Sequence, residues 1–90
     1  MILNDEQIQE LLERFPEWTL DEGKLVKEIS LEDFVAAMEY VNKVAKIAIE
    51  QDHHPDIEIR YNNVVLEIYS HDNAKITDRD VKFIEAVEHI

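Results

Sequence analysis

The chain has 90 residues, 46% of them hydrophobic and 33% charged, proportions that suit one small globular domain over residues 1–90. Its net charge of −12 comes from 21 acidic and 9 basic side chains, without the clustered lysines and arginines that neutralise nucleic-acid phosphates. There is no cysteine, only one glycine, and no apolar run near the ~20 residues of a membrane span. We therefore expect a cytoplasmic protein, without a signal peptide, that binds neither nucleic acid nor membrane.

The first predicted elements are a helix and a β-hairpin. Asn4 with Gln7 three residues later forms a capping-box pattern, apolar residues follow at helical spacing, and Pro16 ends the helix. Two short extended runs then flank the Asp21-Glu22-Gly23 segment, which predicts a hairpin. Trp18 is expected to be a core residue of its first strand.

The longest predicted element is a helix over residues 31–51, opened by Ser30 with Asp33 in the capping-box position. Two apolar stripes cover roughly 200° of its circumference, about twice the stripe of a helix that packs on one surface. One stripe should face a sheet. The other predicts a homodimer or homotetramer with Tyr40 and Val44 at the subunit contact. The first stripe contains Phe34, Ala37, Met38, Val41, Ala45 and Ala48, and the second contains Ala36, Tyr40, Val44 and Ile47.

A second hairpin follows the long helix. Residues 56–61 alternate polar and apolar side chains, which is typical of a strand with one buried face. A two-residue turn at Asn62-Asn63 would place the apolar residues of both strands on one face. Extended beyond the strands, this register aligns His54 with His71.

A third capping-box pattern, Thr77 with Asp80, opens a last helix. The predicted element order is therefore α-β-β-α-β-β-α. We expect an α+β fold in which a four-stranded antiparallel sheet carries three helices on one face.

The predicted hairpin gathers His53, His54 and His71 at one end of the sheet, close to Asp80. Imidazole has an unperturbed pKa of ~6.5, so two imidazoles can serve as base and acid for a small substrate. Two histidines and a carboxylate can also hold a metal, but adjacent strand residues point to opposite faces, which disfavours His53 and His54 sharing an ion. The non-catalytic interpretations are a solvated histidine pair and an aspartate that only caps a helix.

The spacing of these residues resembles a known family signature. His53-His54-Pro55 is followed after five residues by Tyr61, after nine more by His71, and after eight more by Asp80. This pattern is similar to that of the pterin-4a-carbinolamine dehydratases. The early Trp18, the long middle helix and the order of elements also resemble the family, over nearly the whole chain.

The resemblance implies a lyase that dehydrates 4a-hydroxytetrahydropterin to quinonoid dihydropterin, supports tetrahydropterin recycling and needs no metal or organic cofactor. It implies catalytic roles for His53, His54, His71 and Asp80. We expect His53 and His71 to transfer protons, His54 to bind and orient the pterin, and Asp80 to support the site. The expected substrate-binding residues are His53, His54, Pro55, Ser70, His71, Asp72 and Asn73.

Two positions depart from the family pattern. Ile49 stands where the family usually has a polar or charged residue, and Glu50 could replace it only if the helix end unwinds. Ile57 stands at an often aromatic position. The alternatives are therefore a non-catalytic pterin-binding or protein-assembly module of the same fold and, less favoured, a metal enzyme with histidine and carboxylate ligands.

Overall fold

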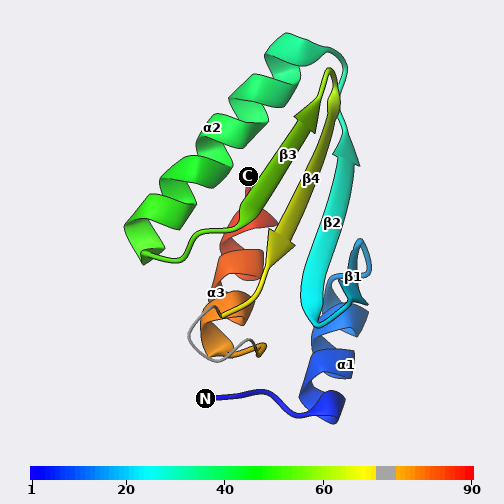
Figure 1. Ribbon diagram of the computed structural model, residues 1–90, viewed down its shortest axis with the longest axis vertical. Helices are drawn as coiled ribbons and strands as arrows, with labels where there is room; N and C mark the ends of the chain where they lie inside the picture. The colour runs from blue at the N-terminus through cyan, green and yellow to red at the C-terminus, as the bar shows by residue number, and fades with distance from the viewer. Residues whose placement is uncertain (71–74) are drawn as a thin grey trace.

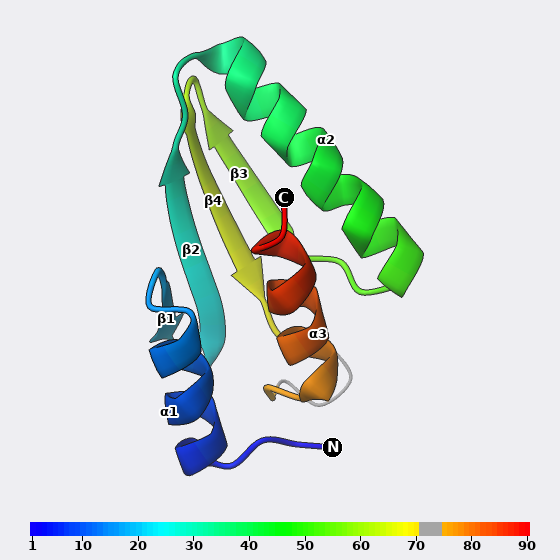
Figure 2. The same ribbon diagram turned by 180° about the vertical axis from the view of Figure 1, so that it is seen from behind.

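The computed structural model describes residues 1–70 and 75–90, and it contains a four-stranded antiparallel sheet in the order β1-β2-β4-β3. The three helices lie on one side of this sheet (Figure 1; Figure 2). The predicted fold class and element order are confirmed. The elements are α1 (Asp5–Arg14), β1 (Trp18–Asp21), β2 (Lys24–Ser30), α2 (Phe34–Gln51), β3 (Asp56–Arg60), β4 (Asn63–Ile68) and α3 (Asp78–Val87).

One hydrophobic core fills the space between the sheet and the helices. The strands alternate between buried and more exposed residues, so each contributes one face to this core. Trp18 of β1 is buried, as predicted. The helices contribute Leu11 from α1, Ala37, Val41, Val44 and Ala48 from α2, and Phe83, Ile84 and Val87 from α3.

The predicted helix starts are confirmed for α1 and α3 but wrong for α2. Asn4 and Gln7 form the expected capping box, as do Thr77 and Asp80. The long helix begins later than Ser30, because Ser30 pairs with Asn63 in the β2–β4 ladder and so stays extended. Asp33 is the N-cap instead, and its side chain accepts a hydrogen bond from the Ala36 amide at 2.8 Å.

The second hairpin turns one residue earlier than predicted. Arg60 lies opposite Asn63, so the turn residues are Tyr61 and Asn62, and Tyr61 adopts a positive φ of 54°. Asn62 is tied to the β2–α2 connection, because its carbonyl and side-chain amide both bond Leu31. The pairing therefore shifts by two residues, which keeps the same faces buried. The observed register differs from the one that predicted an alignment of His54 with His71, and His71 itself lies outside the described residues.

The second apolar stripe of α2 packs within the chain. Val44 is fully buried, and Tyr40 is partly buried against the core. The long helix contacts both β4 and α3, so it has two packing partners within the chain. The prediction that Val44 stands at a subunit contact is wrong, because Val44 is fully buried within the chain.

A polar cluster interrupts the core at the C-terminal end of α3. Lys27, on the core face of β2, is only 7% exposed, and its ammonium pairs with Glu88. The Glu88 carboxylate also accepts a hydrogen bond from Trp18 Nε1 at 3.3 Å. Burial, with the nearby Glu88 and Glu17 charges, raises the pKa of Tyr40 to about 12. The Tyr40 hydroxyl is buried and has no hydrogen-bond partner among the described residues.

Removing Glu88 should destabilise the fold, because it leaves the Lys27 ammonium buried without a counter-charge. We expect Glu88→Ala to lower the free energy of unfolding by about 2–4 kcal/mol. Glu85→Ala, also in α3, is the matched control. It breaks the exposed ion pair between Glu85 and Arg14 of α1 and should lower the free energy of unfolding by less than about 1 kcal/mol. Denaturant unfolding followed by circular dichroism measures both.

A second variant tests the cause of that loss. Lys27→Met combined with Glu88→Gln removes the buried charge and keeps an acceptor for Trp18. It should recover part of the stability lost in Glu88→Ala. Equal losses for Glu88→Ala and Glu85→Ala would contradict the assignment of Lys27 as a buried, paired charge.

Candidate active site

His53 enters the core at the end of α2. The C-cap residue Asp52 adopts the left-handed conformation, with φ of 49°, and turns the chain out of the helix. The His53 amide donates to the Ala48 carbonyl at 3.0 Å. The His53 side chain is buried, with its ring edge-on to Phe83 of α3 and the ring centroids 6.4 Å apart.

The buried partner of His53 is Asp80, in the first turn of α3. His53 Nε2 lies 2.6 Å from Asp80 Oδ1, and Asp80 is fully buried. The other carboxylate oxygen, Oδ2, lies 2.8 Å from the Thr77 amide and 3.0 Å from Ser70 Oγ. Asp80 is thus both a member of the capping box of α3 and the partner of a histidine, so its position in the cap does not exclude a part in the site.

This arrangement favours proton transfer at His53. A carboxylate beside an imidazole stabilises the imidazolium that forms when the ring takes up a proton. Asp80 also lies at the N-terminal end of α3, where the helix dipole favours negative charge. An ionised carboxylate only accepts hydrogen bonds, so a proton shared with an ionised Asp80 would reside on His53 Nε2, and Nδ1 would then be the basic nitrogen of the neutral ring.

The remaining predicted residues are placed differently. His54 is exposed, with Nε2 3.9 Å from an exposed Asp52 carboxylate, and Pro55 is half-buried. The Ser70 hydroxyl is buried against Asp80 and Thr77. The predicted His71, Asp72 and Asn73 lie outside the described residues. Among residues 1–70 and 75–90, no three histidine, aspartate or glutamate side chains are arranged to hold a metal ion.

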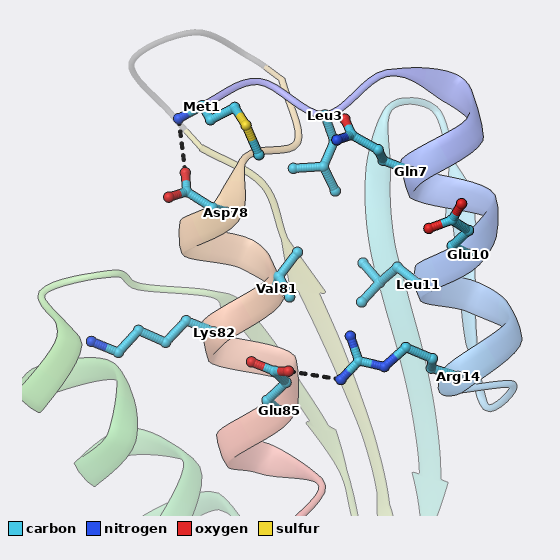
Figure 3. A pocket seen from close by; sticks show the side chains of 10 residues that line it. All are labelled: Met1, Leu3, Gln7, Glu10, Leu11, Arg14, Asp78, Val81, Lys82 and Glu85. Carbon is cyan, nitrogen blue, oxygen red and sulfur yellow. Dashed lines mark hydrogen bonds and ion pairs between the residues drawn. The ribbon is translucent and has the colours of Figure 1, made fainter.

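A cavity of about 380 Å³ lies between α1 and α3 (Figure 3). Leu3, Leu11 and Val81 provide apolar walls, and Arg14 pairs with Glu85 across it at 2.7 Å. At the other end the Met1 ammonium bonds Asp78 and lowers the pKa of that carboxyl. No described histidine lines this cavity, so it is separate from the His53–Asp80 pair.

The family model described as "Pterin 4 alpha carbinolamine dehydratase" matches residues 1–90. The chain belongs to this family. A protein from Acidobacterium capsulatum, named "Putative pterin-4-alpha-carbinolamine dehydratase", is 42% identical over 96% of this chain and 94% of its own length. A protein of the same name from a Picosynechococcus species is 40% identical over 87% and 85% of the two chains.

A solved structure from Brucella melitensis, described as a transcriptional coactivator/pterin dehydratase, superposes with a TM-score of 0.93. It covers 99% of this chain and 97% of its own at 22% identity, so it supports the fold of the family. The departure from the family pattern at Ile49 can be followed in the structure. Ile49 is 72% exposed, and α2 continues regularly to Gln51, so Glu50 does not take its place.

The sequence of this member of the pterin dehydratase family did not reveal the hydroxyl groups near Asp80. Thr77 was assigned only as a helix cap, and Ser70 only as a substrate contact. No sequence spacing shows that the Ser70 hydroxyl and the Thr77 amide meet at one carboxylate, or that the two hydroxyls bond each other, because Ser70 and Thr77 are seven residues apart in the sequence. Within the described chain no helix is both long and apolar enough to cross a bilayer.

Asp80→Ala should destabilise the fold more than loss of an ordinary cap. It leaves the Thr77 amide, the Ser70 hydroxyl and His53 Nε2 without their acceptor, at an expected cost of about 2–4 kcal/mol of unfolding free energy. Asp33→Ala, which removes the single capping bond of α2, should cost about 1 kcal/mol. Chemical denaturation of both variants provides the comparison, and equal costs would contradict the three-donor description of Asp80.

Proposed function

We propose that the chain is a 4a-hydroxytetrahydropterin dehydratase, a cytoplasmic hydro-lyase that supports tetrahydropterin recycling. The observation that carries this proposal is the buried His53–Asp80 pair, 2.6 Å apart, in a chain of the pterin-4a-carbinolamine dehydratase family. The names of the relatives support the same reaction class. The chemistry requires groups that exchange protons near neutral pH, which histidine provides.

The reaction is an elimination of water. A base removes the proton from ring N5, the C4a–oxygen bond breaks, and the departing hydroxyl takes a proton from an acid and leaves as water. The N5–C4a double bond of the quinonoid dihydropterin forms in the same process. No oxidant, reductant or metal is needed to balance these steps, and general acid–base catalysis of this kind contributes about 10²–10⁴-fold in rate.

His53 is the base in this proposal. The Asp80 carboxylate holds its ring at Nε2, and the side chain is shielded from bulk water. His71 is the proposed acid, and the resemblance to the family supports that role. His54 is exposed beside His53 and is available to orient a pterin. Pro55, Asp72 and Asn73 complete the proposed substrate-binding set, whereas Ser70, which the resemblance also implies for that set, is buried against Asp80 and Thr77.

We also propose a homodimer or homotetramer assembled through α2. The corrected contact surface is the exposed face of that helix, since Tyr40 and Val44 pack within the chain. Val35 and Ile49, 64% and 72% exposed, stand at the two ends of this face. Met38, Asn42 and Ala45 lie between them at alternating spacings of three and four residues, the repeat by which paired helices pack. An isologous pairing would cover this apolar stripe.

Dehydration of 4a-hydroxytetrahydropterin tests the proposed activity. The purified protein should accelerate the reaction above its spontaneous rate, and His53→Ala should lower the catalysed rate at least about tenfold, because the base is lost. His89→Ala is the matched control, since His89 is exposed at the end of α3 and bonds only the Glu85 carbonyl among the described contacts. Activity should survive dialysis against EDTA.

Two outcomes would replace this proposal. A rate equal to the blank would favour the non-catalytic pterin-binding or assembly module, with Ile49 as the departure that removed turnover. Loss of activity with EDTA and recovery with zinc or iron would favour the metal enzyme.

A charge on the exposed face of α2 should weaken self-association. Val35→Glu and Ile49→Glu each place a carboxylate in the proposed contact and should reduce the mass measured by light scattering at ~50 μM. Leu20→Glu, at an exposed apolar position on β1, is the control and should leave the mass unchanged. A mass of one chain for the unmutated protein would refute the assembly.

A further inference from the structure

The Ser70 hydroxyl is buried at the centre of a chain of hydrogen bonds. Ser70 is 3% exposed, and its Oγ lies 2.6 Å from Thr77 Oγ1 and 3.0 Å from Asp80 Oδ2. Thr77 Oγ1 in turn accepts a hydrogen bond from the Arg79 amide at 3.2 Å. The chain therefore runs from the first turn of α3, through two hydroxyls, to the carboxylate that holds His53.

Counting hydrogens fixes the direction of this chain. Each hydroxyl has one hydrogen to donate, and an ionised carboxylate has none. Ser70 must therefore donate to Asp80 Oδ2. Its hydrogen is then used, so Thr77 must donate to Ser70, while the Thr77 oxygen accepts from Arg79. Every donor and acceptor in this segment is then matched.

We propose that Ser70 and Thr77 are positioning residues that set the tautomer of His53 through Asp80. This proposal rests on the proposed dehydratase function for its kinetic consequence. Two donors, the Ser70 hydroxyl and the Thr77 amide, hold Asp80 Oδ2 on the side of β4 and the α3 N-terminus. They direct Oδ1 at His53 Nε2, which carries the proton and leaves Nδ1 free to act as the base.

The arrangement gives Ser70 a different role from a substrate contact. Its oxygen is buried and bonds two side chains among the described residues, Thr77 and Asp80, so its effect on a pterin passes through Asp80 and His53. Among the described donors, loss of the hydroxyl leaves Oδ2 with the Thr77 amide. The carboxylate can then rotate, and the neutral His53 ring can populate its other tautomer, in which Nδ1 is protonated and not basic.

Ser70→Ala tests the proposal. The catalysed kcat should fall about threefold to tenfold, the effect of one net hydrogen bond, while KM stays within about twofold. Nitrogen-15 NMR of the His53 ring should show protonated Nε2 in the unmutated protein and a fraction of protonated Nδ1 in the variant. Ser30→Ala is the matched control, since the only other serine is exposed and bonds Asn63.

Thr77 provides a second, independent test. Thr77→Val removes both the donor to Ser70 and the helix-capping oxygen and should lower kcat by a similar factor. Thr77→Ser keeps the hydroxyl and should restore most of the rate lost in Thr77→Val. If Ser70→Ala does not fold, Ser70→Cys takes its place, because cysteine keeps the shape and is a weak donor.

The outcomes separate the possible roles. An unchanged kcat with an unchanged His53 tautomer would overturn the proposal. A rise in KM alone, with the tautomer preserved, would also overturn it and would make Ser70 a substrate contact. If the unmutated protein shows no turnover, the proposed function fails, and the tautomer measured in Ser70→Ala decides the positioning role by itself.

Discussion

The fully buried carboxylate of Asp80 is the group on which the site depends. It accepts hydrogen bonds from an imidazole, a hydroxyl and a backbone amide, and it lies at the N-terminal end of α3. An isolated buried carboxylate would be costly, but three donors and a helix dipole replace its lost hydration. The same contacts that start the helix therefore orient His53, so helix capping and the chemistry of the ring cannot be varied independently.

The second polar group in the core, Lys27 with Glu88, lies at the opposite end of the same helix. Asp80 precedes the apolar side of α3, and Glu88 follows it as the C-cap. Phe83, Ile84 and Val87 between them are fully or almost fully buried. Apolar packing alone is non-directional, whereas a charge that must meet one partner defines the position of the helix along its axis. We infer that these two polar pairs fix α3 against the sheet and against α2.

The features that the sequence predicted correctly are local ones. Asn4 with Gln7 and Thr77 with Asp80 form capping boxes because three-residue spacing alone brings those groups together. Tertiary contacts decided the features that were predicted wrongly. Ser30 pairs with β4 instead of opening a helix, and Asn62 bonds Leu31, which moves the hairpin turn by one residue. Val44 is fully buried, and α2 contacts α3 as well as β4, a second partner that the periodicity of α2 could indicate but not identify.

The site was predictable in its residue types and less so in its geometry. The spacing from His53 to Asp80 predicted that both residues belong to one site, but it did not predict that they contact each other directly. The sequence predicted different roles for the two neighbouring histidines, but it could not show that the chain, after the left-handed Asp52 cap, places His53 in the core and His54 at the surface. A buried imidazole held by a carboxylate is suited to exchanging one proton at one nitrogen. An exposed imidazole beside it is suited to contact a ligand. The turn at Asp52, a single residue with positive φ, therefore precedes two adjacent histidines that differ in solvent exposure.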